Sequence, residues 1–294
     1  MKPSIGHISL SDLTPELVQK FYNDKFKAGR YDGEGGLSSA TVRKIHNILH
    51  DALNQAVLNN LVHRNSANAT KRPKLQQKEI KVFTVEEQKL FMNTLKDDEL
   101  GTAFLMDLST GMRLGELLAL KWKNVDLDQG IVWVRESVTR VRTHDPKDVK
   151  TKLITQAPKT KSGYREIPLP TVIVEMLKKH KEKQENIVHE PNIHYEDKGL
   201  VFCTENGNYI EPRNFMRKFY NLLYKADLTR TNVHSIRHSF ATRLFEANES
   251  AKTVQELMGH SDISHTLNIY THVMPEIKRS AVQKLNRMFE DFEI

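Results

Sequence analysis

Apolar residues recur every three or four positions over several stretches of this chain, which is the spacing of an amphipathic helix. The first stretch lies within residues 10–29. The second runs from about residue 38 to residue 61, and its apolar stripe consists of Val42, Ile45, Leu49, Leu53, Ala56 and Val57. The two stretches predict a small helical unit at the start of the chain, with the glycine-rich loop YDGEGG between its helices.

Positive charge is concentrated in and just after this unit. Residues 1–80 hold 12 Lys and Arg against 7 Asp and Glu, so they account for +5 of the net +7 of the chain. Arg43, Lys44 and His46 lie off the apolar stripe, on a face that is either solvated or in contact with DNA. Residues 67–82 lose all periodicity and carry a proline together with Lys71, Arg72, Lys74, Lys78 and Lys81. We interpret this stretch as a basic interdomain linker, either a solvated tether or, as we favour, a segment that follows a phosphate backbone.

A larger set of elements follows the linker. Thr84 and Glu87 have the spacing of a capping box that starts a helix, and helical spacing continues to Leu120. Alternating β-branched residues predict one hairpin with its turn at residues 128–130 and another with its turn at residues 161–163. Further helices are expected at about residues 171–187, 212–226, 234–247, 251–258, 264–272 and 276–291. The expected fold class is therefore mainly α with a small antiparallel β-sheet, and the expected domains are residues 1–66, the linker 67–82 and residues 83–294.

Composition sets the broad class of protein. A share of 38% apolar residues in a chain of 294 is sufficient for a globular core, and no stretch approaches the roughly 20 apolar residues of a membrane span. Cys203 is the only cysteine, which excludes an intrachain disulfide and fits a reducing bacterial cytoplasm. The net charge of +7 and the isoelectric point near 9.2 favour a polyanionic partner.

Side chains suited to phosphate chemistry gather between residues 234 and 270. Arg237 stands between two histidines in HSIRH, His260 follows in LMGHSDIS, and Tyr270 stands in NIYTHV. Arg113, in TGMRLGEL, lies far upstream, so folding must bring it to the others. A guanidinium binds phosphate oxygens bidentately and stays charged, whereas a histidine gives and takes protons near neutrality. Together these groups could bind a phosphodiester beside a tyrosine nucleophile.

Such an attack also needs a proton for the departing 5′ oxygen. A lysine in a flexible hairpin turn could supply it, and both Lys159 and Lys161 fit. The mechanism then needs no metal and no cofactor. His234 and His238 do have the i, i+4 spacing of a zinc pair, but no carboxylate or thiolate cluster accompanies them, and the arginine between them would repel a cation.

Five ordered motifs, TGMRLGELLAL, APKTKSGYREIPL, HSIRH, LMGHSDIS and NIYTHV, together resemble the tyrosine recombinase, or phage integrase, family from about Thr84 to Pro275. The resemblance implies that a tyrosine cleaves one DNA strand, leaving a covalent 3′-phosphotyrosine and a free 5′ hydroxyl. It further implies double-stranded DNA as partner and strand exchange within a homotetramer on that DNA. Carried over to this chain, the family's site consists of the phosphate-binding Arg113 and Arg237, the motif histidines His234 and His260, the hairpin Lys159, the nucleophile Tyr270, and Glu116, which orients Arg113.

The chain departs from the family pattern in three places. Tyr270 comes ten residues after His260, where many recombinases have nine, and this spacing resembles integrases of conjugative transposons and temperate phages. Lys159 and Lys161 both flank the hairpin turn, and we choose Lys159. Members of this branch carry an arm-site DNA-binding domain and a first core-binding helix that are absent here. Residues 1–66 therefore resemble part of a core-binding domain, and either the chain has been trimmed or the protein is naturally short.

The expected function is site-specific recombination that integrates and excises a mobile element. One alternative is a Xer-type recombinase that resolves chromosome dimers, which the ten-residue spacing disfavours. The other is a DNA-binding relative with idle motifs, which the intact motif residues disfavour. The apolar tail at residues 276–292 is expected to form a helix that packs on its own domain or docks on a neighbouring subunit.

Overall fold

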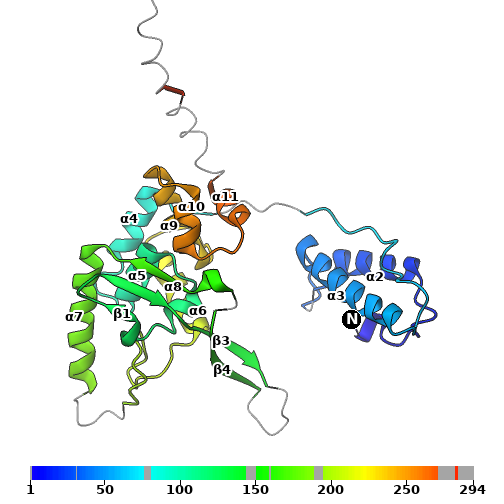
Figure 1. Ribbon diagram of the computed structural model, residues 1–294, viewed down its shortest axis with the longest axis horizontal. Helices are drawn as coiled ribbons and strands as arrows, with labels where there is room; N and C mark the ends of the chain where they lie inside the picture. Colours follow the sequence, from blue (N-terminus) through cyan, green and yellow to red (C-terminus); the bar gives the residue numbers. More distant parts are fainter. Residues whose placement is uncertain are drawn as a thin grey trace, which may run out of the picture. The chain divides into compact units, whose positions relative to one another are not determined.

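The computed structural model describes most of the chain (Figure 1). The described residues are 2–30, 32–75, 81–143, 150–158, 160–188, 195–270 and 282–283, without the side chains of Lys2, Asn268 and Tyr270. Contacts divide the chain into two compact units, Met1–Glu79 and Ile80–Ile294. Within the described residues, none of the helices combines the length and the hydrophobicity that a membrane span requires.

The first unit is built on two amphipathic helices, as the sequence predicts. It contains α1 (Lys2–Ile5), α2 (Pro15–Ala28) and α3 (Ser39–Leu58). The hydroxyl of Thr14 caps α2 and that of Ser38 caps α3, each by accepting a backbone N–H of the first turn. The apolar faces of α2 and α3 meet in a core that consists of Leu13, Val18, Phe21, Tyr22, Val42, Leu53 and Ala67.

His46 does not lie on the solvated face that the sequence predicts. Its side chain is only 7% exposed, and its ring centroid lies 5.5 Å from that of Tyr22 and 5.5 Å from that of His50. Burial, reinforced by the charges of Arg72, His50 and Arg43, lowers the pKa of His46. The buried stripe of α3 therefore includes position 46, one helical turn after Val42.

The start of the predicted linker packs on this unit. Ala67 is fully buried. The backbone N–H of Lys71 donates to Oε1 of Gln19 on α2 at 2.7 Å, and the guanidinium of Arg43 on α3 donates to the carbonyl of Pro73 at 3.3 Å. The division between the units, after Glu79, falls within the predicted linker.

The helices of the second unit begin at the predicted capping box. The Glu87 N–H donates to Oγ1 of Thr84 at 3.1 Å, while the Thr84 N–H donates to Oε2 of Glu87 at 2.8 Å. The helices of this unit are α4 (Val85–Asn93), α5 (Gly101–Thr110), α6 (Leu114–Leu117), η1 (Trp122–Asn124), α7 (Thr171–Val188), α8 (Pro212–Lys225), α9 (His234–Glu246), α10 (Ala251–Met258) and α11 (Ile263–Tyr270). The prediction of α7 to α10 is confirmed within one residue at each end, and the helix predicted at residues 276–291 lies almost wholly outside the described residues.

The strands form two small antiparallel sheets. One has the order β1-β2-β5, from β1 (Val125–Asp126), β2 (Ile131–Val134) and β5 (Arg165–Pro168); the other pairs β3 (Ser137–Arg142) with β4 (Thr151–Gln156) and projects from the unit (Figure 1). The hairpin around residues 128–130 is confirmed. The hairpin predicted around residues 161–163 is wrong, because its flanking strands β4 and β5 pair with β3 and β2 rather than with each other.

The core of the second unit brings its segments together around a cluster of aromatic rings and aliphatic side chains. The rings belong to Phe83, Phe91, Phe104, Phe215 and Phe219. The helix α9 packs against α5, α10 and α11. The fold class, mainly α with small antiparallel sheets, is confirmed, and α9 in this arrangement joins the segments that carry the site.

Candidate active site

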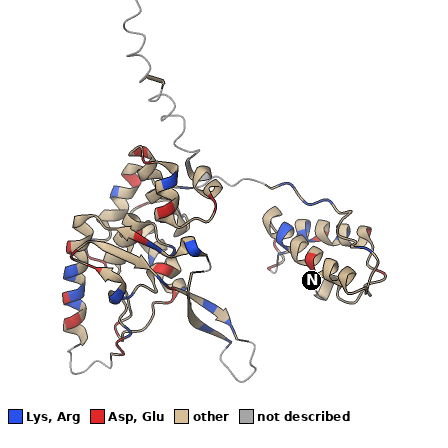
Figure 2. Cartoon of the chain, in the orientation of Figure 1, with Lys and Arg blue, Asp and Glu red and all other residues tan. Residues whose placement is uncertain are grey.

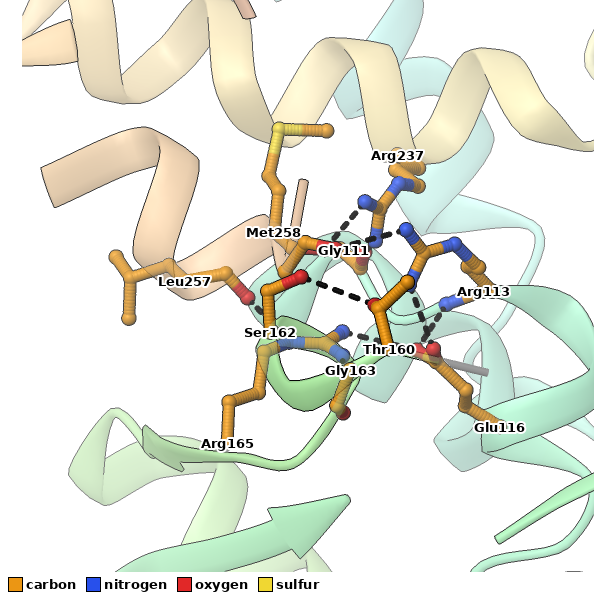
Figure 3. A network of polar contacts seen from close by, with 11 residues as sticks. Gly111, Arg113, Glu116, Thr160, Ser162, Gly163, Arg165, Arg237, Leu257 and Met258 are labelled. Atoms are coloured by element: carbon orange, nitrogen blue, oxygen red, sulfur yellow. Dashed lines mark hydrogen bonds and ion pairs between the residues drawn. The ribbon is translucent and has the colours of Figure 1, made fainter. Parts of the chain in front are cut away.

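Three arginines from distant segments bind the end of α10 (Figure 3). Nε of Arg165 donates to the carbonyl of Leu257 at 2.7 Å, Nη2 of Arg237 to that of Met258 at 2.5 Å, and Nη2 of Arg113 to that of Gly259 at 2.9 Å. The last carbonyls of a helix have no partner within the helix and carry the negative end of its dipole. The end of α10 therefore holds three positive charges in one place.

Gly259 lets the chain leave α10 at this point. Its φ of +63° is left-handed, and it ends the helix as the C-cap. A Cβ atom at this position would lie 2.7 Å from the carbonyl oxygen of Ser162 and 2.8 Å from Nη1 of Arg165. Both the backbone conformation and the close approach of the 161–163 turn therefore require glycine here.

Glu116 connects two of the three arginines. Its carboxylate accepts the backbone N–H of Arg113 at 2.9 Å, Nη1 of Arg113 at 2.8 Å and Nη2 of Arg165 at 2.9 Å. The Glu116 side chain is 4% exposed, whereas that of Arg113 is 42% exposed. Burial raises the pKa of Glu116, but the hydrogen bonds and charges of both arginines outweigh it and leave that pKa below its usual value. The carboxylate thus stays charged and orients Arg113.

Arg237 is the most deeply buried cation of the site. It lies on α9, is 1% exposed, and donates through Nη1 to the carbonyl of Gly111 at the end of α5. Burial, together with the charges of Arg113 and Arg165, lowers the pKa of Arg237 to about 9, so the guanidinium remains charged at neutral pH. Asp107 on α5 is also buried, and burial raises its pKa well above the usual range.

Two histidines adjoin the arginines. His234 is the first residue of α9, and His260 follows Gly259 directly. Nδ1 of His260 shares a hydrogen bond of 2.8 Å with the hydroxyl of Thr266, which is fully buried on α11. Burial, followed by the charges of Arg237 and Arg113, lowers the pKa of His234 to about 4 and that of His260 to about 3. Both imidazoles are therefore neutral at neutral pH, and a phosphate anion bound beside them would raise their affinity for a proton.

The fold brings together most of the residues that the sequence predicts for the site. Arg113, Glu116 and Arg237 share the network at the end of α10, and His234 and His260 feel the charges of both arginines. Tyr270 ends α11, which packs against α9 and α10, but its side chain lies outside the described residues. Lys159 also lies outside them, whereas Lys161 is exposed in the turn η2 (Lys161–Gly163).

The predicted DNA-contacting residues belong to the first unit and to the start of the linker. Lys44, Lys71, Arg72 and Lys74 are exposed and Arg43 is half-buried, while Lys78 lies outside the described residues. Lys and Arg recur along the segment that follows α3 (Figure 2). Arg43, Lys44, Lys71, Arg72 and Lys74 thus give the first unit positive charges that are exposed or half-buried.

Sequence reasoning missed Arg165 and Thr266. Arg165 lies in the predicted hairpin and Thr266 in the predicted helix, but neither stands in a spacing that marks it as functional. The signal in each case is a contact between distant segments: Arg165 reaches Glu116 and Leu257, and Thr266 reaches His260. Chemically, the whole arrangement offers fixed guanidinium groups beside two neutral imidazoles, which suits an oxyanion that gains charge while a proton leaves its attacking group.

Comparison with known proteins gives consistent results. Residues 81–276 match the phage integrase family. The chain is 37% identical to a tyrosine recombinase XerC-like protein of Caldanaerobacter subterraneus, covering 92% of this chain and 70% of that protein. It is 28% identical to the ICEBs1 integrase of Bacillus subtilis, covering 86% and 67% respectively. Among solved structures, the Tn1549 transposon integrase in complex with transposon right end DNA is similar in fold, with a TM-score of 0.74, 22% identity and coverage of 93% of this chain and 86% of that one.

Proposed function

Because the chain belongs to the phage integrase family and is a tyrosine recombinase, an enzyme that cleaves and rejoins DNA, we propose that it cleaves one DNA strand with Tyr270 as the nucleophile. The observation that carries this proposal is the convergence of Arg113 and Arg237 on the end of α10, directly before His260. Two guanidinium groups held in fixed positions are suited to the two non-bridging oxygens of one phosphodiester.

The cleavage step is a transfer of the phosphoryl group to the enzyme. The phenolic oxygen of Tyr270 attacks phosphorus, a bond from phosphorus to that oxygen forms, and the bond from phosphorus to the 5′ oxygen breaks. The proton of the phenol passes to His234 or His260, which are neutral before the reaction because burial lowers the pKa of each. Lys159 gives a proton to the 5′ oxygen.

The products are a covalent 3′-phosphotyrosine and a free 5′ hydroxyl, so the energy of the phosphodiester bond is retained. Attack by a 5′ hydroxyl of another strand on the phosphotyrosine releases Tyr270 and rejoins DNA. Throughout both steps Arg113 and Arg237 stabilise the charge that grows on the non-bridging oxygens. Removing one such donor from a comparable oxyanion site costs about 10²–10³ in rate.

We assign the contact with DNA outside the cleavage site to the first unit and the linker. Residues 1–66 form the core-binding domain in this proposal, residues 67–82 the basic linker and residues 83–294 the catalytic domain. The predicted contacts with the DNA backbone are Arg43, Lys44, Lys71, Arg72, Lys74 and Lys78. Support comes from the exposure of Lys44, Lys71, Arg72 and Lys74, and from the solved Tn1549 integrase, which is bound to transposon DNA.

The proposed biological role is integration and excision of a mobile element by a homotetramer on DNA, in which residues 276–292 connect neighbouring subunits. The similarity to the ICEBs1 integrase supports this role. The higher identity to a XerC-like recombinase favours a second candidate, the resolution of chromosome dimers. The two roles differ in the DNA that is cut, namely element ends or a chromosomal dimer-resolution site.

A suicide duplex with a nick beside the scissile phosphate tests the chemistry and the role together. The protein should form a covalent adduct in the presence of a chelator, with duplexes that carry the ends of the element. The Tyr270→Phe variant should bind the same duplexes without forming the adduct. Adduct formation by Tyr270→Phe would contradict the assignment of the nucleophile, and adducts with dimer-resolution sites alone would favour the second role.

A further inference from the structure

Arg165 is bound on three sides by segments of the candidate active site. It lies on β5 just after η2, and its side chain is 6% exposed. Nη2 donates to Glu116 at 2.9 Å, Nε to the carbonyl of Leu257 at 2.7 Å and Nη1 to the carbonyl of Gly163 at 3.3 Å. One guanidinium thus ties together α6, the end of α10 and the turn of residues 161–163 (Figure 3).

We propose that Arg165 is a positioning residue for strand cleavage, an inference that rests on the proposed function of the same site. Arg165 touches neither the phosphate nor the reacting atoms in this account. It holds Glu116, and through Glu116 it holds Arg113, in a fixed position relative to His260. The same contacts keep the turn after Lys159 against the end of α10.

Arg165 stabilises the charge of Glu116. Its carboxylate is almost fully buried, and of its two cationic partners only Arg165 is buried with it, since Arg113 is 42% exposed. A buried carboxylate that loses its cation either takes up a proton or turns towards water. Loss of Arg165 should therefore weaken the two hydrogen bonds with which Glu116 orients Arg113.

Arg165 also binds the end of α10. The carbonyls of Leu257, Met258 and Gly259 bind Arg165, Arg237 and Arg113 in that order, so the three arginines share one helix end. Removing Arg165 frees the carbonyl of Leu257. This residue directly precedes Met258, whose carbonyl binds Arg237. A misplacement of about 1 Å in a catalytic constellation costs about 10²-fold in rate.

A matched pair of variants tests the proposal. Arg165→Gln removes an arginine that binds one carboxylate and backbone carbonyls within the site. Arg243→Gln removes an arginine of α9 that binds the carboxylate of Glu246 at 2.8 Å and the carbonyl of Phe83 at 2.9 Å, outside the network. Single-turnover adduct formation is measured at saturating suicide duplex, together with the Kd for DNA and the thermal midpoint of each variant.

We expect Arg165→Gln to slow adduct formation by at least about tenfold with a Kd within about twofold of wild type, because the loss lies in positioning rather than in binding. Arg243→Gln should lower the thermal midpoint but keep the rate within about twofold. Arg165→Lys keeps the charge near Glu116 but cannot reach all three acceptors, so its rate should lie between those of wild type and Arg165→Gln. If Arg165→Gln does not fold, Arg165→Lys carries the test, and a wild-type rate in it would overturn the proposal.

A double-mutant comparison shows whether Arg165 acts through Glu116. Glu116→Gln alone should slow the reaction, and adding Arg165→Gln should slow it by no more than about twofold further, since both changes break one chain of contacts. Full multiplication of the two effects would overturn the proposed path through Glu116.

Hydrogen exchange without DNA separates this proposal from the proposed function. The N–H of Gly259 donates to Glu256 and that of His260 to Gln255, so both amides are bonded in the free protein. Arg165→Gln should speed the exchange of these two amides by about tenfold or more, and Arg243→Gln should not. If the wild type forms no adduct but Arg165→Gln speeds the exchange of these amides, the proposed function is contradicted while the positioning role of Arg165 stands. If the exchange is unchanged in Arg165→Gln, the positioning role fails.

Discussion

Nη2 of Arg113 donates a hydrogen bond of 2.9 Å to the carbonyl of Gly259, although 146 residues separate the two in the chain. Gly259 immediately precedes His260, so this bond holds Arg113, the proposed phosphate ligand, close in space to His260, the proposed proton acceptor. The same arginine is held from its other side by Glu116. The geometry of the site therefore depends on long-range contacts as much as on its individual groups.

Arg113→Lys should leave DNA binding nearly intact and slow cleavage by about 10²–10³-fold. The guanidinium of Arg113 binds Glu116 and Gly259 through different nitrogens, and a single ammonium cannot keep both contacts and grip a phosphate as well. Single-turnover cleavage and filter binding measure the two effects. Arg243→Lys, outside the network, is the matched control, and equal rates for the two variants would contradict the assigned role of Arg113.

Gly259→Ala should destabilise the protein more than Gly199→Ala, although both changes place an alanine in a left-handed backbone conformation. Gly199 has a φ of +65°, close to the +63° of Gly259, but no atom lies within 4 Å of where its Cβ would be. Gly199→Ala therefore reports strain alone, at about 1–2 kcal/mol. Gly259→Ala adds the contact with Ser162 and should cost at least about 1 kcal/mol more in urea unfolding. Equal losses in the two variants would show that the turn of residues 161–163 can move away freely.

Thr266→Val should slow cleavage because it removes the hydroxyl that shares a hydrogen bond with Nδ1 of His260. Valine has nearly the same shape but leaves the imidazole without this partner, whereas Thr266→Ser keeps it. We expect a loss of about tenfold for Thr266→Val, with a shifted pH profile of cleavage, and a rate near wild type for Thr266→Ser. Similar losses in both variants would point to packing of α11 rather than to the hydrogen bond.

The two site histidines should make the free protein less stable as the pH falls below about 6.5. Their pKa values are about 4 for His234 and about 3 for His260 in the folded protein, chiefly through burial, and near the ordinary value of about 6.5 in the unfolded chain. In this window the unfolded chain binds protons that the folded chain does not. The free energy of unfolding therefore decreases as protons are added.

Urea unfolding at about pH 7 and about pH 4.5 measures this decline, and a variant with His234→Gln and His260→Gln should lose part of it. Burial raises the pKa of Asp107. This residue therefore makes the free energy of unfolding decrease as the pH rises above the usual pKa of a carboxyl, which is opposite to the effect of the histidines. Asp107 is present in both proteins, so their difference isolates the histidines. A variant that declines as steeply as wild type would contradict the pKa values of the two histidines.

The fold could be predicted from the sequence wherever its signal was local. Helical periodicity located α10 at residues 251–258, its observed bounds, and the Thr84–Glu87 capping box is present as predicted. The second hairpin was mispredicted because the partner of a strand is chosen by the whole fold: β5 pairs with β2, which lies more than 30 residues upstream. His46 differs from the prediction because a polar ring is expected on the solvated face, whereas the fold buries it beside Tyr22, and Ile45 packs against the same core.

The residues of the candidate site likewise fall into those that local motifs predict and those that only the folded structure identifies. The motifs that resemble the tyrosine recombinase family identified Arg113, Glu116, His234, Arg237 and His260 as members of one site, and the family itself is confirmed. The roles of these residues remain predictions. Arg165 and Thr266 could not be found in this way, since their contacts exist only after β5, α10 and α11 have packed.

The central claim, that Tyr270 becomes bonded to DNA, is tested most directly by mass spectrometry of the trapped adduct. The protein is incubated with a suicide duplex, the complex is digested with protease and nuclease, and the peptide that carries residual nucleotide is sequenced. We predict a single modified peptide with a 3′-phosphonucleotide on the oxygen of Tyr270. A nucleotide attached to any other residue, with Tyr270 recovered unmodified, would contradict the account.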